Sequence, residues 1–246
     1  MKLFMVNMAI LLWFNSYPIG NETPLIFPIP SDIQIHEGKF NVDKTTGLQN
    51  SHLLPGDIKT GNKMFHLTSA GNKNAIVVGD EIKSAKVIQV NKDVSSIIFL
   101  QACAKEALND KAYGIIYNFD DTAEPLGWYE IVYEDAMVET IPIRYGVNIL
   151  DWRWRQRIMA DEKEKGKYSQ SKYAYNARAV DCAKDNSDPI TFFSFEWKNP
   201  RFGKKIKEVN LWSVNYKKGN ENSIILLAVN IAGNEKMTNA KGTEAQ

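Results

Sequence analysis

The sequence predicts an all-β protein, an antiparallel β-sandwich with one charged excursion between strands. From Lys63 onward, short apolar segments follow one another at close and regular spacing, separated by turn residues. Within residues 113–154, apolar and polar residues alternate in three successive stretches, as they do in half-buried antiparallel strands. Strands so closely spaced leave little chain for crossover helices, which favours a sandwich or jelly roll over an α/β fold.

The first twenty residues have the pattern of a secretory signal peptide. Lys2 is followed by an apolar run from Leu3 to Phe14 that only Asn7 interrupts, and small, turn-forming residues come next. The run is too short to span a bilayer, and no cysteine lies near it for a lipid anchor. We therefore expect residues 1–20 to be a signal peptide and the protein to be secreted, periplasmic or held at the cell surface. A buried first strand or helix is the alternative.

Composition divides the remaining chain into three parts. Residues 21–60 are rich in turn-forming proline and glycine, and contain two short alternating segments at Ile33–Ile35 and Phe40–Val42. Residues 61–232 carry the predicted sandwich. Residues 233–246 are polar, and we expect them to form a disordered tail.

The strongest alternation lies in the second stretch of the central meander. Aromatic and aliphatic residues from Tyr129 to Tyr133 fall on one face, and Trp128 and Glu130 fall on the other. An acidic turn then leads to a third stretch, which we expect to continue as a strand as far as Trp154.

A charged segment at residues 153–172 interrupts the strands. It predicts a short helix from Arg155 to Lys165 without a wide apolar stripe, so we interpret it as a solvated excursion. A loop that reaches over a ligand is the alternative. Beyond it, Ile190–Trp197 resumes the strand pattern. The run at Ser223–Ile231 is apolar on both faces, which predicts a central strand covered on both sides.

Charge and motif content argue against several classes of protein. A formal net charge of +1 gives no electrostatic argument for nucleic acid or for an anionic membrane. The three histidines form no zinc-binding pattern, and no phosphate-binding loop or nucleophile elbow is present, so we expect no cofactor. The Asp120-Asp121 corner offers oxygen ligands for a structural calcium ion, although an ordinary turn is the commoner use of such a pair. Cys103 and Cys182 would suit a disulfide in an oxidising compartment, but we favour two separate thiols.

Two segments carry a resemblance to a known group of domains, GWYEIVYEDAMVETIPIRYGVNI at 127–149 and WKNPRFGKKI at 197–206. With the flanking strands, residues 62–231 resemble the accessory β-sandwich modules found near the C-terminus of secreted bacterial glycoside hydrolases. The resemblance implies a galactose-binding-like jelly roll with a non-catalytic role. In addition, PIPSDIQIHEGKFNVDKTT at 28–46 resembles the opening of the small N-terminal domain of β-hexosaminidases.

Carboxylates are plentiful, but their spacing does not predict a glycosidase. Retaining enzymes hold two carboxyl groups about 5 Å apart, and inverting enzymes hold them roughly 6.5–9.5 Å apart. Glu130 and Glu134 would share a strand face but lie about 13 Å apart. A pair formed across strands stays open, and solvent-facing acids are the commoner arrangement. We therefore expect no catalysis, with a hydrolase fragment related to β-hexosaminidases as the alternative.

The aromatic residues give the better argument for function. Sugars stack their C–H faces on tryptophan, while their hydroxyls bond to planar polar groups. Tryptophans of the meander that faced outward beside an acid or an arginine would form a stacking platform, and burial in the core is the commoner alternative. The predicted function is a secreted carbohydrate-binding module whose partner is a glycan or a glycan-degrading enzyme, and a protein–protein module is a further hypothesis. The candidate ligand-binding residues are Trp128, Glu130, Arg144, Asp151, Trp152 and Trp154.

Overall fold

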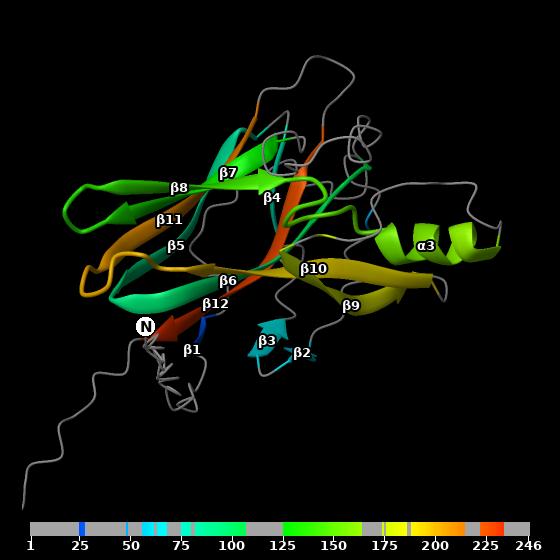
Figure 1. The fold of residues 1–246 in the computed structure, drawn as a ribbon, viewed down its shortest axis with the longest axis horizontal. Coiled ribbons are helices and arrows are strands. Elements are labelled where there is room, and N and C mark those ends of the chain that lie inside the picture. Colours follow the sequence, from blue (N-terminus) through cyan, green and yellow to red (C-terminus); the bar gives the residue numbers. More distant parts are fainter. Residues whose placement is uncertain are drawn as a thin grey trace, which may run out of the picture.

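The computed structural model is an antiparallel β-sandwich, as the sequence predicts, and Figure 1 shows its two main layers. One helix accompanies the strands in the part of the chain that the structure describes. The described residues are 25–27, 48, 56–61, 63–67, 75–79, 82–106, 125–163, 174, 176–185, 188–214 and 222–233.

The larger layer is a six-stranded sheet in the order β1-β12-β6-β10-β9, with β4 also paired to β12. All of its neighbouring strands are antiparallel. Because β1 and β4 pair with different parts of β12, the strands β12 and β6 lie at the centre of the layer. The bounds are β1 Leu25–Phe27, β4 Ile76–Val78, β6 Val94–Cys103, β9 Ala177–Asp185, β10 Asp188–Lys198 and β12 Ile224–Gly233.

The smaller layer is a four-stranded antiparallel sheet in the order β5-β11-β7-β8. A separate hairpin of β2 and β3 lies on the other side of the six-stranded sheet (Figure 1). The bounds are β2 Gly56–Thr60, β3 Lys63–Leu67, β5 Ser84–Lys92, β7 Pro125–Tyr133, β8 Val138–Arg144 and β11 Ile206–Ser213.

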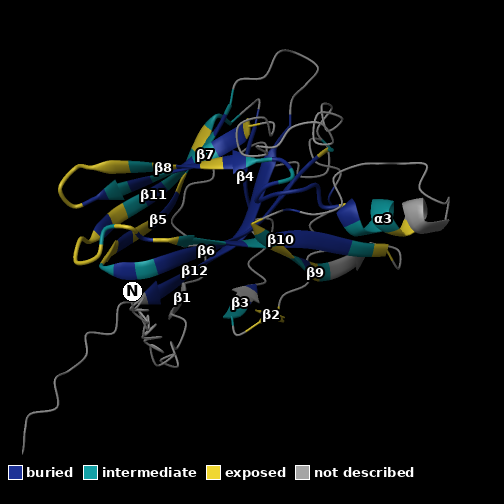
Figure 2. Ribbon diagram, viewed as in Figure 1, coloured by how far each residue is buried: buried dark blue, intermediate teal, exposed yellow. Residues whose placement is uncertain are grey.

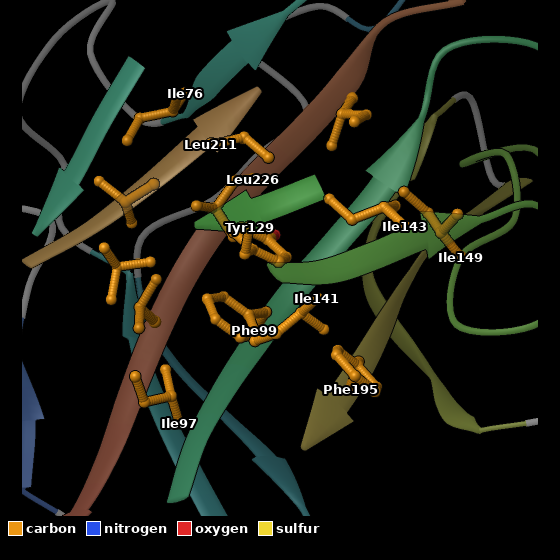
Figure 3. Packing of buried hydrophobic residues seen from close by; sticks show 14 of the residues in the cluster. Ile76, Ile97, Phe99, Tyr129, Ile141, Ile143, Ile149, Phe195, Leu211 and Leu226 are labelled. Atoms are coloured by element: carbon orange, nitrogen blue, oxygen red, sulfur yellow. The ribbon is translucent and has the colours of Figure 1, made fainter. Parts of the chain in front are cut away.

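The main core fills the space between the two sheets. Phe99 of β6 stacks on Tyr129 of β7 with ring centroids 3.8 Å apart, and Phe195 packs against the same Phe99 at 6.2 Å. Figure 3 shows these rings among aliphatic side chains from both sheets. The buried Tyr129 hydroxyl donates to Oε1 of Gln101 at 2.6 Å, so its polar atom is satisfied. Each large apolar side chain buried here contributes about 1.5–3 kcal/mol.

A second core covers the opposite face of the six-stranded sheet. Phe65 from the hairpin and Trp152 pack there against Phe192 of β10 and Leu227 of β12. The central strands are therefore buried on both faces, as Figure 2 shows for β12. This confirms the interpretation of the run at Ser223–Ile231, where apolar residues occupy both sides of the strand.

The third strand of the meander is shorter than predicted. The strand β8 ends at Arg144 because Gly146 adopts a positive φ of 81°, a conformation that glycine tolerates and that a strand cannot accommodate. The side chain of Asn148 then caps the strand end. Its amide nitrogen donates to the Pro142 carbonyl at 2.9 Å, and its oxygen accepts the Arg144 N–H at 2.9 Å. The residues that follow leave the sheet, and the predicted strand conformation at Trp154 is wrong.

The charged segment does form a helix, α3, at Trp154–Lys163. One side of this helix contacts the rest of the protein, whereas the sequence predicted a segment surrounded by solvent. Arg157 forms an ion pair with Asp151 and donates to Glu106 at 3.1 Å, and Gln156 donates to the Pro189 carbonyl at 3.1 Å. These polar contacts attach one side of the helix to the sandwich, together with Trp154 and Ile158, which pack against the main core.

Several predictions fall outside the described residues. These are the signal peptide at 1–20, the strands at Ile33–Ile35 and Phe40–Val42, the calcium corner Asp120-Asp121, and the tail beyond residue 233. Within 21–60, the described strands β1 and β2 pair with β12 and β3, so parts of that segment belong to the folded body.

Metal-ligand and membrane-span patterns are absent from the described ranges. No group of three histidine, cysteine or acidic side chains there could hold a metal ion. No helix in these ranges is long and apolar enough to cross a membrane. Cys103 is buried, Cys182 is half-buried, and both are free thiols.

Candidate functional site

The side of the four-stranded sheet that points away from the main core is the candidate functional site, and we call it the outer face. Alternate residues of these strands are buried against the core, and the residues between them are half-buried or exposed (Figure 2). Antiparallel pairing brings side chains of neighbouring strands into rows across this face. The outer face includes Lys86, Trp128, Glu130, Val132, Val138, Thr140, Pro142, Arg144, Glu208, Asn210 and Trp212.

Two tryptophans form the apolar part of the outer face. Trp128 of β7 pairs directly with Trp212 of β11, and Pro142 of β8 lies opposite Trp128 on its other side. The two rings are parallel within 5°, with centroids 5.9 Å apart, and both side chains are half-buried. The indole nitrogen of Trp212 is buried without a hydrogen-bond partner among the described residues. An unsatisfied donor costs about 1–3 kcal/mol, a cost that folded proteins mostly avoid unless the position serves another purpose.

A hydrogen-bonded polar pair lies one row away from the tryptophans. The side-chain amide of Asn210 donates to Oε1 of Glu130 at 3.1 Å, and Thr140 is the next residue in the same row. The Asn210 amide also bonds to Glu208, and the remaining oxygens of Glu130 and Asn210 can accept hydrogen bonds.

An ion pair completes the polar part of the outer face. Lys86 lies 2.6 Å from Glu208, and its hydrogen bond lowers the pKa of the Glu208 carboxyl below the ordinary value. Glu208 is therefore ionised near neutral pH and can only accept hydrogen bonds.

Three of the six predicted ligand-binding residues lie on the outer face. Trp128 and Glu130 follow the predicted alternation of β7, and Arg144 lies at the end of β8 on the same side as Pro142. The Nε atom of Arg144 is buried without a hydrogen-bond partner in the described ranges. The outer face therefore carries an indole, a carboxylate and a guanidinium group that the sequence suggested, with Arg144 four residues along β8 from Thr140, the residue opposite Glu130.

The other two predicted tryptophans belong to the cores. Trp152 is fully buried in the second core, and the Arg153 guanidinium lies 4.5 Å from its ring centroid. Trp154 is buried in the main core and meets Phe193 edge-on at 5.8 Å. Both residues follow the break at Gly146, so they do not continue the face of β8. Because both side chains are buried, they cannot belong to a stacking platform on the surface. The alternative given for the tryptophans, burial in the core, holds for these two.

Asp151 is also buried, and its contacts are structural. Its carboxylate accepts the Tyr145 hydroxyl at 3.0 Å and pairs with Arg157. Burial, together with the neighbouring Asp151 charge, raises the pKa of Tyr145 well above its ordinary value. This network joins the turn after β8 to α3 and does not reach the outer face.

Asn210 and Trp212 were not predicted from the sequence. They are the partners of Glu130 and Trp128 in the two central pairs of the outer face. Their alternation with the buried Val209 and Leu211 was visible in the sequence. Their pairing with β7 was not visible, because it joins residues 80 positions apart.

Comparisons with protein-family models, with curated proteins and with solved structures give no match to this chain.

Proposed function

We propose that this protein is a non-catalytic carbohydrate-binding module that uses the outer face to bind a glycan. The observation that carries the proposal is the parallel pair of Trp128 and Trp212 beside the hydrogen-bonded pair of Glu130 and Asn210. A half-buried aromatic surface next to convergent polar groups is the combination that sugar rings require.

Each part of the outer face has a separate role in this proposal. The exposed portions of the indoles stack on the C–H face of a sugar ring. The amide of Asn210 and the carboxylate of Glu130 bond to neighbouring hydroxyls, because they present planar donors and acceptors. Arg144 supplies a forked cation at the edge of the same face.

The arrangement of acids supports binding more than hydrolysis. A glycosidase needs a general acid whose pKa is raised so that it holds a proton near neutral pH. The Lys86 ammonium lowers the pKa of Glu208, and Glu130 accepts a hydrogen bond from Asn210. The environment of Glu208 does not resemble the apolar pocket that favours a protonated carboxyl.

The wider setting is part of the same proposal. We infer an exported accessory module, related in fold to the jelly-roll domains that accompany secreted glycoside hydrolases. The resemblance of residues 127–149 and 197–206 supports this setting, and the outer face gives the module a binding surface.

Affinity electrophoresis in gels that contain soluble polysaccharides tests the proposal, with a glycan array to broaden the search. The chain is compared with Trp128→Ala, Trp212→Ala and a control, Phe202→Ala, which removes an exposed aromatic ring from the loop between β10 and β11. We expect at least one polysaccharide to retard the chain and the control. Both tryptophan variants should lose about tenfold or more in affinity, since stacking supplies much of the contact. Binding to no glycan, or equal binding by all four proteins, would overturn the proposal.

A further inference from the structure

Exposed apolar side chains gather at one end of the sandwich. Of the four large apolar side chains exposed in the described ranges, three lie at this end: Phe202 at 73% exposure in the β10–β11 loop, Met137 at 56% in the β7–β8 turn and Val138 at 49% at the start of β8. The fourth, Met159, lies on α3. Figure 1 shows the β7–β8 turn and the β10–β11 loop extending together at one end of the molecule. We call Met137, Val138 and Phe202 the apolar tip.

Hydrogen bonds and an ion pair hold the two loops of the tip together. Arg201 grips Asp135 with two bonds of 3.1 and 2.8 Å, and its guanidinium lies 4.5 Å from the Tyr133 ring centroid. The Arg201 bond lowers the pKa of Asp135 well below its ordinary value, so this link persists in mild acid. Alongside it, the Glu134 N–H donates to the Lys205 carbonyl at 2.9 Å.

A third loop, the β5–β6 turn, supports the same frame. The Gly203 N–H donates to Asp93 at 3.2 Å, and the Asn199 amide donates to the Val94 carbonyl at 2.8 Å. The Tyr133 hydroxyl in turn donates to Asn199 at 2.7 Å. The tip therefore keeps its apolar groups exposed on a well-connected frame, and their exposure is not the result of a loose loop.

Lysine and acidic side chains surround the apolar tip, and the acidic ones form hydrogen bonds or ion pairs within the loops. Lys204 and Lys205 follow Phe202 after one glycine, and both are exposed. The acids of the three loops are each engaged within the frame: Asp93 with Gly203, Asp135 with Arg201 and Lys204, and Glu134 with the Lys205 N–H. The Lys204 ammonium lies 3.4 Å from Asp135, and Lys205 adds an exposed cation close to the apolar groups along the chain.

We propose that the apolar tip inserts into the interface of an anionic lipid bilayer. Three exposed side chains offer an area of the order of a few hundred Å². A standard protein interface takes about 800 Å² from each partner, so the tip alone is too small for one. A bilayer interface accepts a small apolar projection with adjacent cations, because the apolar groups reach the acyl boundary while ammonium groups meet lipid phosphates.

This contact is independent of the glycan site. Along β7, Trp128 lies six residues before the turn, about 20 Å at the rise of a strand, and four residues, about 13 Å, before Val132, which pairs with Val138 of the tip. With the tip in the interface, the pair of Trp128 and Trp212 would remain in water and accessible to a glycan.

Co-sedimentation with vesicles of phosphatidylcholine and phosphatidylglycerol tests the proposal. The chain should sediment with these vesicles, and less with phosphatidylcholine alone or at high salt. Phe202→Ser should lower the partition coefficient about tenfold or more, since the lost area contributes directly to binding. The matched control is Met159→Ser, which removes an exposed apolar group from α3 and should change nothing. Far-UV circular dichroism verifies that both variants fold.

A second measurement reports insertion itself. Phe202→Trp adds an indole at the tip, and bromine atoms on the upper acyl carbons of the lipid should quench its added fluorescence. Absence of vesicle binding would overturn the proposal, as would equal losses in Phe202→Ser and Met159→Ser. If the chain does not bind vesicles but self-associates through Phe202, the tip is a surface for contact with another protein chain and the proposal fails.

Discussion

Trp128 and Trp212 occupy directly paired positions of β7 and β11, and their rings lie parallel within 5° at a centroid separation of 5.9 Å. The strand pairing beneath them sets this arrangement. Gly127 pairs with Ser213 immediately beside the two rings, so a small residue allows close approach of the backbones.

Gly127→Ala should disturb the tryptophan pair by changing the backbone next to it. A Cβ atom at this position would collide with the carbonyl oxygen of Trp212 and lie 2.7 Å from Cδ1 of Ile224. Backbone atoms cannot yield as a flexible side chain does, so we expect a destabilisation of about 1–3 kcal/mol. Denaturant unfolding measures this loss, and glycan affinity should fall with it. Unchanged stability and affinity would show that β7 and β11 approach less closely than described.

Trp152→Ala should act on stability and leave glycan recognition alone. Truncation of this fully buried ring leaves a cavity in the second core, and the expected cost is about 3–5 kcal/mol. Trp128→Ala removes a half-buried ring and should cost at most about 2 kcal/mol. Urea unfolding of the two variants gives the comparison. A stable Trp152→Ala variant with lost glycan binding would contradict the assignment of Trp152 to the core.

Arg157→Ala should destabilise the protein far more than Arg155→Ala. Removal of Arg157 leaves the Asp151 carboxylate, only 4% exposed, without its cation, at a cost of about 3–5 kcal/mol. The partner of Arg155 is Asp181, whose side chain is 44% exposed, so that pair should contribute less than about 1 kcal/mol. Thermal or urea unfolding distinguishes the two. Equal effects would mean that the network around Asp151 does not anchor α3.

Acid should weaken the fold through Glu196. Partial burial alone would raise the pKa of Glu196, but hydrogen bonds from Lys198 and Lys63 outweigh it and lower the pKa from 4.5 to about 2. The unfolded chain therefore binds this proton first as pH falls. Stability from this carboxylate is complete above about 4.5 and is lost as pH falls towards about 2. Unfolding free energies measured across that window should decline less steeply in Glu196→Gln. An identical slope in both proteins would argue against the contribution of Glu196.

The fold could be predicted from local patterns more fully than the site. Alternation between Trp128 and Tyr133 identified β7 and its buried face, and the apolar run of β12 identified a strand covered on both sides. The same alternation failed beyond Gly146, because a single left-handed residue ended the strand and redirected Trp152 into a core. The alternation of apolar and polar residues does not predict such a turn when a single glycine is the only turn-forming residue in it.

The residues that β11 contributes to the outer face could not be predicted from the sequence, for a different reason. Trp128 and Glu130 could be assigned to an outward side, but their partners on β11 depend on which strands pair. That choice is made by packing across the whole sandwich, and no short-range pattern encodes it. The candidate site therefore became complete only with the register of β7 and β11.

Nuclear magnetic resonance of the indole N–H groups tests the glycan-binding surface most directly. The chain has six tryptophans, and assignment by single substitutions separates those of the outer face from those of the cores. On titration with an oligosaccharide of the polysaccharide that retards the chain best, we predict that the Trp128 signal shifts in a saturable way while Trp152 and Trp154 stay in place. Saturable shifts confined to the buried tryptophans, or none at Trp128 while the sugar binds, would contradict the account.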